Sequence, residues 1–336
     1  MNHSPIDLLL DLASDRLGGK VLAANDEFFA PKENLIADTD PVWDAGKFTP
    51  RGKWMDGWET RRRREPGHDW ALVKLGIPGI VLHVVIDTAH FTGNFPESAS
   101  IEAIDLPGDP DIVELVRDPS RWTEIVPRRE IRGDTRNEIE LKGTKQVTHV
   151  RLVIHPDGGV ARLRMLGEPV PPDGLLDGTR EVDLAAVHNG ARAIDCSDRH
   201  YSSPNRMLVP GRAQGMWDGW ETKRRRGPGN DWAVIRLAGR GSVSRIELDT
   251  THFKGNAPGS CDVEGIDARG ATIGGLRLAA WTPVVEERPV TPDHRHRFDG
   301  LDGGPFTHLR LNIYPDGGVA RFRAWGRSDE PWTSPA

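Results

Sequence analysis

The chain has 336 residues, with 50 acidic against 44 basic side chains and a formal net charge of −6. This acidic balance excludes a general nucleic-acid binder, which would usually carry a basic excess. Hydrophobic residues make up 37% of the chain, and the 37 glycines and 26 prolines favour many short strands joined by turns over a helical protein.

The N-terminal segment 5–16, PIDLLLDLASDR, suits a short helix, and its counterpart in the second half of the chain is 181–187. Its leucine run is too short and too acidic for a secretory signal or a membrane span. The only cysteines, Cys196 and Cys261, do not form the pattern of a disulfide framework or a zinc site. We therefore expect a cytoplasmic protein that does not associate with membranes.

Three long segments of the chain occur twice. The first copy contains DGWETRRRREPGHDWALVKL at 56–75, DTAHFTGN at 87–94 and THVRLVIHPDGGVARLRMLG at 148–167. Their second copies lie, in the same order, at 218–237, 249–256 and 307–326. Each copy has the size of a single domain and can bury its own core. Polar residues are retained as tightly as apolar ones, which indicates a chemistry or an interface that both copies kept.

Short runs rich in β-branched residues predict strands inside each copy. In the first copy these runs are 69–75, 80–88, 98–105, 121–127, 148–155 and 160–166. Asp-Gly-Gly within 155–159, repeated within 314–318, predicts a hairpin between the last two strands, because glycine tolerates the positive φ of a tight turn. The pattern favours an all-β fold, an antiparallel sandwich or jelly roll.

A segment rich in proline and glycine, 168–178, separates the copies. We predict a first module at 1–170, a linker at 171–180 and a second module at 181–336. Segment 20–29 aligns with 191–201, and the separation between these two segments is larger than that between the later repeated segments. The first module therefore carries an insertion around 36–50.

The arginine runs are candidates for binding a carboxylate, because a planar guanidinium donates two parallel hydrogen bonds to it. In an extended chain Arg62 and Arg64 share one face and Arg63 points to the other. The alternative is a solvated basic edge that discourages aggregation. The substrate-binding candidates are Arg62, Arg63, Arg64, Arg224, Arg225 and Arg226.

Glu59 and Glu221 precede these arginines in both copies. A carboxylate beside arginines stays ionised and serves as a general base. The alternative is a structural salt bridge to the same arginines.

His90 and His252 follow a predicted strand, and Asn94 and Asn256 come four residues later. Loops at the end of a sandwich commonly carry binding residues, and a histidine there exchanges protons near neutral pH. The alternative is a histidine ring that is held in hydrogen bonds of its own loop.

Other paired residues are predicted to be structural. They are Asp56/Asp218, Asp69/Asp231, Trp58/Trp220, Trp70/Trp232 and His149/His308. Histidines without a histidine in the other copy, namely His68, His83 and His155, are poor catalytic candidates. No motif establishes a metal site or a cofactor, and a divalent metal remains open.

These repeated motifs, with SDRLGGKVLAANDEFFAPKENLI near the N-terminus, resemble the allantoicase family over residues 10–328. The resemblance implies two jelly-roll modules of the galactose-binding or discoidin-like kind and an assembly of several subunits. It also implies a hydrolase acting on carbon–nitrogen bonds of linear amidines, which converts allantoate to ureidoglycolate and urea in the degradation of allantoin.

Allantoate has one carboxylate on a carbon that bears two ureido groups, and the candidate residues fit these groups. The arginines fit the carboxylate, and the paired asparagines fit the ureido groups because an amide both donates and accepts. The paired glutamates and histidines divide the base and acid roles. The alternative function is a non-catalytic tandem sandwich that binds carbohydrate or another small ligand. Whether one module or both hold a site is left open.

Overall fold

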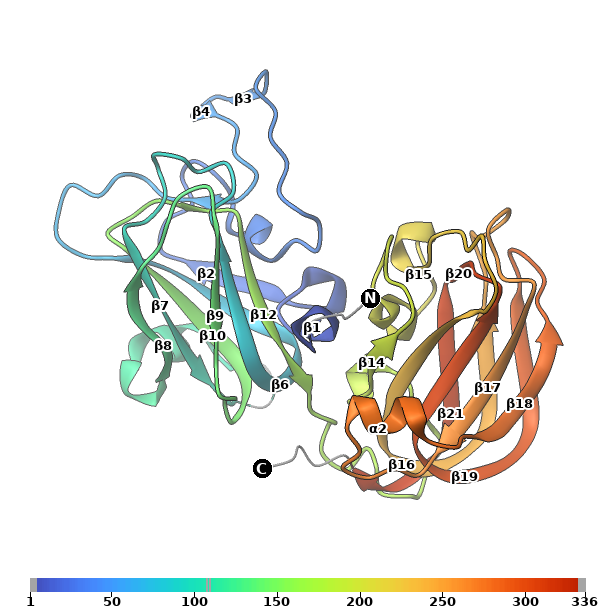
Figure 1. Ribbon diagram of the computed structural model, residues 1–336. Coiled ribbons are helices and arrows are strands. Elements are labelled where there is room, and N and C mark those ends of the chain that lie inside the picture. Colours follow the sequence, from blue (N-terminus) through green and yellow to red (C-terminus); the bar gives the residue numbers. More distant parts are fainter. Residues whose placement is uncertain (1–4, 107, 109, 332–336) are drawn as a thin grey trace. The chain divides into compact units, whose positions relative to one another are not determined.

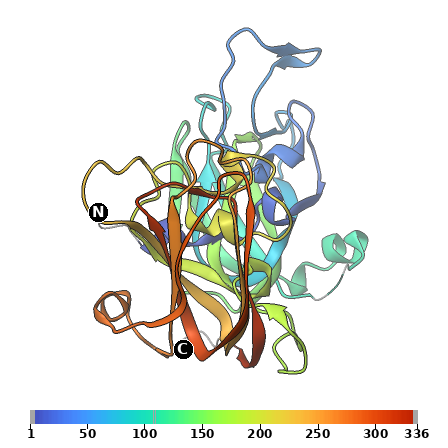
Figure 2. The same cartoon turned by 90° about the vertical axis from the view of Figure 1, so that its right-hand side faces the viewer.

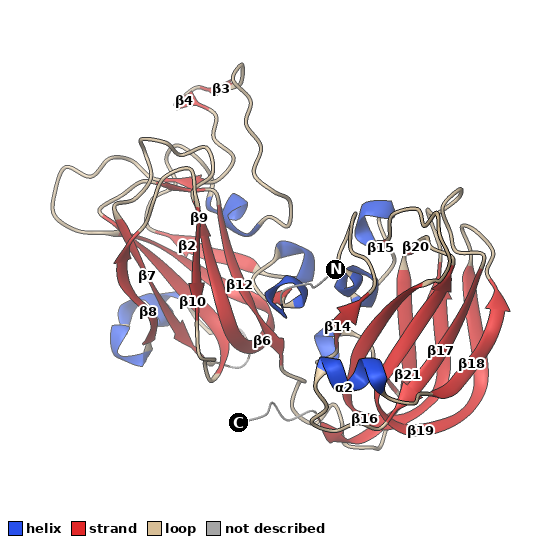
Figure 3. Ribbon diagram, in the orientation of Figure 1, coloured by secondary structure: helices blue, strands red, loops and turns tan. Residues whose placement is uncertain are grey.

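The computed structural model describes residues 5–106, 108 and 110–331. The chain divides into two compact units, one formed by Leu10–Val170 and the other by residues 5–9 with 171–331. Both units consist almost entirely of strands (Figure 3). No helix in the described part of the chain is long and apolar enough to cross a bilayer.

The first module is a β-sandwich (Figure 1). Its sheet has the order β1-β12-β6-β10-β7-β8, and β2 and β9 also pair with β6. Its strands are β1 Leu10–Asp11, β2 Lys20–Ala24, β3 Phe48–Thr49, β4 Gly52–Lys53, β5 Trp58–Glu59, β6 Asp69–Asp87, β7 Ser98–Ile104, β8 Thr123–Glu130, β9 Arg136–Glu140, β10 Gln146–His155, β11 Gly159–Val160 and β12 Arg162–Pro169. Its one α-helix among the described residues is α1 Ile112–Arg117, and short 3₁₀ turns lie at Asp15–Leu17, Lys32–Ile36 and Pro119–Arg121.

The second module repeats this plan with the order β13-β21-β16-β19-β17-β18, and β14 also pairs with β16 (Figures 1 and 2). Its strands are β13 Val182–Asp183, β14 Arg192–Cys196, β15 Trp220–Glu221, β16 Asp231–Asp249, β17 Ser260–Ile266, β18 Thr282–Pro289, β19 Arg295–Tyr314, β20 Gly318–Val319 and β21 Arg321–Pro331. The helix α2 covers Ile273–Leu278, and 3₁₀ turns lie at Val187–Asn189, Pro204–Leu208 and Met216–Asp218. The jelly-roll sandwich predicted for both modules is confirmed.

Strand β6 belongs to both layers of its sandwich. Its first half, from Asp69 to Lys74, pairs with β2 and β10, and its second half, from Gly79 to Asp87, pairs with β12 and β9 and, at Gly79 and Ile80, still with β10. The sequence predicted two separate strands because Pro78-Gly79 interrupts the apolar run. The strand instead continues through this point, where its pairing changes from one layer to the other.

Two local predictions are wrong. Segment 5–16 does not form one helix, because Leu10 and Asp11 pair as a strand with β12 between two 3₁₀ turns, Pro5–Leu8 and Asp15–Leu17. The turn after β10 does not close a hairpin, because β6 lies between β10 and β12 in the sheet and pairs with both of them. Gly159 and Val160, at the end of the turn, instead form β11, which pairs with β5 and brings the turn to the Trp-Glu segment.

The predicted structural role of the first tryptophan pair is confirmed. Trp58 and Trp220 are fully buried, and their indole N–H groups donate to the carbonyls of Asp26 and Asp198 at 2.8 and 2.9 Å. Burying an aromatic side chain of this kind contributes about 2–3 kcal/mol. The tryptophans therefore hold the segment that carries the neighbouring glutamate.

Candidate functional site

In each module the Trp-Glu strand, the loop after the long central strand and the Asp-Gly-Gly turn meet at one end of the sandwich. The N–H of Thr60 donates to the carbonyl of Gly158 at 3.1 Å, and the N–H of Gly159 donates to that of Asn94 at 2.7 Å. The second module repeats both contacts, through Thr222 with Gly317 and through Gly318 with Asn256. Segments far apart in the sequence thus form one surface.

The structure brings the predicted glutamate and asparagine together in both modules. Asn94 Nδ2 donates to Glu59 Oε1 at 2.7 Å, and Asn256 Nδ2 donates to Glu221 Oε1 at 2.6 Å. Glu59 is buried, Glu221 is half-buried, and each lies on a two-residue strand that is paired with the glycine turn. The repeated pair forms the centre of the candidate site.

The surroundings of Glu59 differ from the sequence expectation. Among the residues that the structure describes, no arginine forms an ion pair with Glu59. Burial raises the pKa of the Glu59 carboxyl above its ordinary value, and the hydrogen bond from Asn94 opposes that rise. Such a carboxyl is better suited to exchange a proton near neutral pH than an arginine-paired one.

The paired histidines have an unusual backbone. In the described part of the chain, four residues other than glycine have positive φ: His90 at 70°, Asp134 at 48°, His252 at 74° and Asp293 at 52°. The carboxylates of Asp134 and Asp293 accept from the backbone N–H of His90 and His252, both at 2.8 Å. Sparsely populated backbone conformations are found preferentially at functional sites, so these loops are candidates independently of their sequence.

Both histidine rings contact a backbone carbonyl. The Nε2 atom of His90 lies 3.3 Å from the carbonyl oxygen of Pro41, and that of His252 lies 3.0 Å from that of Ala213. In the first module the indole of Trp43 also stacks on His90, with ring centroids 5.9 Å apart. The loop hydrogen bonds weighed as an alternative are therefore present, and each leaves the other ring nitrogen, Nδ1, outside this contact.

The arginine loop alternates as predicted, although it is not a strand. Arg62 and Arg64 are exposed, whereas the guanidinium of Arg63 donates to buried Asp69 at 2.6 Å. The backbone N–H of Arg63 donates to Asp157, on the same turn that contacts Thr60, at 2.7 Å.

In the second module Arg225 pairs with Asp231 in the same way, and Arg224 and Arg226 are exposed. The structural roles predicted for Asp69 and Asp231 are confirmed.

The arginine loop lines a pocket of its own. This pocket has a volume of about 570 Å³ and is lined by Asn25, Asp26, Arg61, Arg62, Arg63, Arg64, Glu65 and Asp69. Neither Glu59, Asn94 nor His90 is among these residues. The structure therefore joins glutamate to asparagine and fixes each histidine loop, while the arginines face a neighbouring part of the same surface.

The surroundings of His149 and His308 fit the structural role predicted for them. His149 and His308 are buried, and their Nδ1 atoms lie 2.9 Å from the hydroxyls of Thr148 and Thr307. Cys196 and Cys261 are free thiols inside the fold. In the described residues, no group of three or more His, Cys, Asp or Glu side chains is arranged to hold a metal ion.

Sequence reasoning missed two residues of each module. Asp134 and Asp293 cap the histidine loops, and Arg162 and Arg321, in β12 and β21, are almost fully buried. A signal existed, because all four are retained between the two copies.

Comparison with known proteins decides the family. A family model described as "Allantoicase repeat" matches residues 10–170 and again 182–329. The chain belongs to the allantoicase family. It is 44% identical over 326 residues to a protein of Burkholderia mallei named "Probable allantoicase 1", covering 96% of this chain and 95% of that one.

Two further members support this assignment. A Dictyostelium discoideum protein named "Allantoicase" is 46% identical over 317 residues, which cover 93% of this chain and 85% of that protein. The crystal structure of a Saccharomyces cerevisiae allantoicase superposes with a TM-score of 0.81 at 39% identity, covering 94% of this chain and 92% of that one. The family resemblance inferred from the repeated motifs is confirmed.

Proposed function

We propose that this protein hydrolyses allantoate to ureidoglycolate and urea. The relatives named above match nearly the whole chain, and their names are those of the enzyme with this activity. The observation that carries the proposal is the duplicated Glu–Asn pair, whose asparagine lies in the same loop as a duplicated histidine of positive φ. Both modules retain the pair, so we place one site in each module.

The exposed arginines bind the carboxylate of allantoate. Arg63 and Arg225 hold their loops through buried aspartates, which leaves the neighbours on either side to bind the carboxylate of allantoate. These neighbours are Arg62, Arg64, Arg224 and Arg226. An amide group such as that of Asn94 matches a ureido group, because both donate and accept hydrogen bonds.

The reaction replaces a carbon–nitrogen bond by a carbon–oxygen bond. Water adds its oxygen to the central carbon of allantoate, the bond to one ureido nitrogen breaks, and that nitrogen leaves as urea with one added proton. We assign the donation of this proton to the Glu59 and Glu221 carboxyls and the removal of a proton from water to Nδ1 of His90 and His252. The raised pKa of Glu59 supports the donor role.

The direct test is to incubate the purified protein with allantoate and to measure urea and ureidoglycolate, with and without a chelator. We expect one urea per ureidoglycolate. Absence of urea under all conditions, including added divalent metal ions, would contradict the proposal, and binding of glycans would then favour the carbohydrate-binding alternative. A cytoplasmic location and a homo-oligomeric state remain proposals, and fractionation and light scattering test them.

A further inference from the structure

The carbonyl contact of each histidine determines which ring nitrogen carries the proton. A backbone carbonyl only accepts hydrogen bonds, so the ring atom that contacts it, Nε2 of His90 or His252, is the donor. In the neutral ring the other nitrogen, Nδ1, then has the free lone pair. The positions of the carbonyls of Pro41 and Ala213 therefore determine the tautomer of each neutral histidine.

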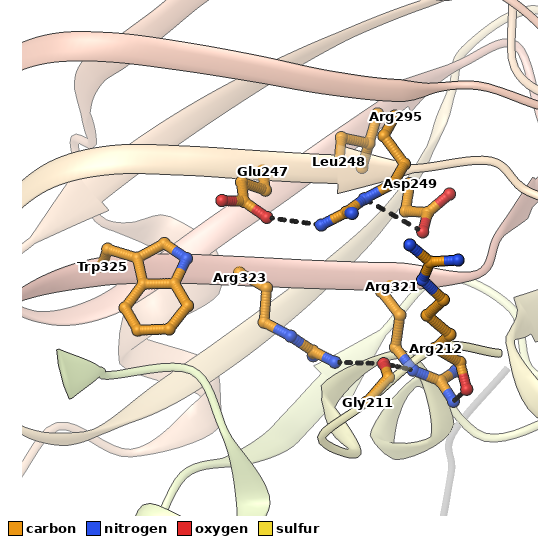
Figure 4. A pocket seen from close by; sticks show the side chains of 9 residues that line it. All are labelled: Gly211, Arg212, Glu247, Leu248, Asp249, Arg295, Arg321, Arg323 and Trp325. Carbon is orange, nitrogen blue, oxygen red and sulfur yellow. Dashed lines mark hydrogen bonds and ion pairs between the residues drawn. The ribbon is translucent and has the colours of Figure 1, made fainter.

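In the second module a buried arginine fixes the segment that carries this carbonyl. Arg321 donates to the carbonyls of Gly211 and Arg212, at 3.1 and 3.2 Å, and to Asp218 Oδ2 at 2.7 Å. The same oxygen of Asp218 accepts from the N–H of Gln214 at 3.0 Å. Ala213 thus lies between residues held on either side, and Figure 4 shows Arg321 directed at the backbone of Gly211 and Arg212.

The first module contains the same arrangement. Arg162 donates to the carbonyl of Thr39 at 2.9 Å and to Asp56 Oδ2 at 2.9 Å, and Asp56 accepts from the N–H of Val42 at 2.9 Å. Pro41 lies between Thr39 and Val42, as Ala213 lies between Gly211 and Gln214. The insertion follows Val42, so the longer first module retains the contacts that hold the carbonyl.

Burial makes these contacts demanding. Arg321 is 3% exposed and Asp218 is fully buried, and Arg162 is 1% exposed. A buried ion pair of this kind is tolerated only where further hydrogen bonds satisfy both partners. A lysine has a single ammonium and cannot donate to the spread of acceptors that a guanidinium reaches.

We propose that Arg162 with Asp56, and Arg321 with Asp218, are positioning residues that hold the catalytic histidines His90 and His252 as Nε2–H tautomers by fixing the 39–42 and 211–214 segments. The proposal rests on the proposed function for the role of the histidines in catalysis. The tautomer itself is a property of the fold and can be measured without turnover.

The test uses the full chain with ¹⁵N-labelled histidine and the variant Arg162→Lys/Arg321→Lys. Assignment of the two histidines comes from His90→Gln and His252→Gln spectra. In the unmodified protein we expect His90 and His252 to carry the proton on Nε2. In the double variant we expect both to become mixtures of tautomers, with kcat for urea release lowered about 10-fold or more and KM changed less than about twofold.

The matched control is Arg151→Lys/Arg310→Lys. These arginines are also duplicated and paired with glutamates, Glu102 and Glu264, but they lie on β10 and β19 facing β7 and β17. We expect this control to keep the wild-type tautomers and the wild-type kcat. Both double variants can lose thermal stability. If only Arg162→Lys/Arg321→Lys also changes the tautomers, these arginines position the histidines and do more than stabilise the fold.

Two results would overturn the proposal: protonation of Nδ1 in the unmodified protein, or unchanged tautomers in the folded double variant. If Arg162→Lys/Arg321→Lys does not fold, Asp56→Asn/Asp218→Asn keeps the side-chain shape and is judged by the same signals. A changed tautomer with unchanged kcat would refute the catalytic role of the histidines while leaving the positioning contact in place. If no urea is formed at all, the tautomers alone decide the positioning.

Discussion

His308 makes the stability of the second module sensitive to acid. It is 2% exposed, and burial, reinforced by the nearby charge of Arg236, lowers its pKa from 6.5 to about 4. Because the folded pKa is depressed, the unfolded chain takes up the proton first as the pH falls below 6.5. The stabilisation is therefore complete above pH 6.5 and is lost progressively towards pH 4.

The linkage relation gives the size of this effect. For pKa values of 6.5 and about 4, the unfolding free energy lost between pH 7.5 and pH 5 is about 2 kcal/mol. The perturbation is His308→Gln, which removes the titrating ring. We expect the difference in unfolding free energy between wild type and variant to shrink by this amount over that interval.

The assay is guanidinium unfolding followed by tryptophan fluorescence at both pH values. The control is His200→Gln, which replaces an exposed histidine of the same module, and we expect it to show the wild-type dependence of stability on pH. A stability difference between wild type and His308→Gln that stays constant from pH 7.5 to 5 would refute the reasoning.

Two further substitutions test the packing around the candidate site. Arg63→Met leaves the 1% exposed carboxylate of Asp69 without its cation, so we expect a loss of about 3 kcal/mol in unfolding free energy, whereas Arg62→Met, at an exposed position, changes it by less than about 0.5 kcal/mol. Gly159→Ala places a methyl group 2.0 Å from the fully buried ring of Phe91, and thermal unfolding should reveal a loss of about 3 kcal/mol; an unchanged midpoint for either variant would contradict these contacts.

The sequence predicted the architecture better than its connections. The repeat and the strand pattern were sufficient for two all-β modules, because alternation and turn residues are local properties. The Asp-Gly-Gly turn was read as a hairpin because its chemistry is that of a hairpin. The strands on either side of the turn do not pair with each other because β6 lies between them, and no local pattern in the sequence reports that.

The sequence predicted which residues belong to the candidate site but not which residues they contact. Retention in both copies selected Glu59, Asn94 and His90, and the structure joins the first two directly. The sequence did not predict the ion pair between Arg63 and Asp69. Alternation in an extended chain gives the face on which a side chain lies, but it does not give the residue that this side chain contacts. Asp134 was missed although Asp293 repeats it in the second copy, because 44 positions separate it from its histidine and spacing alone does not connect the two.

The central claim is that the duplicated glutamates perform the hydrolysis of allantoate. Urea release per chain from wild type, Glu59→Gln, Glu221→Gln and the double variant tests it most directly. Independent sites in both modules predict that each single variant retains part of the activity and that the double variant loses about 10²-fold or more. Wild-type urea release by a folded double variant would contradict the account.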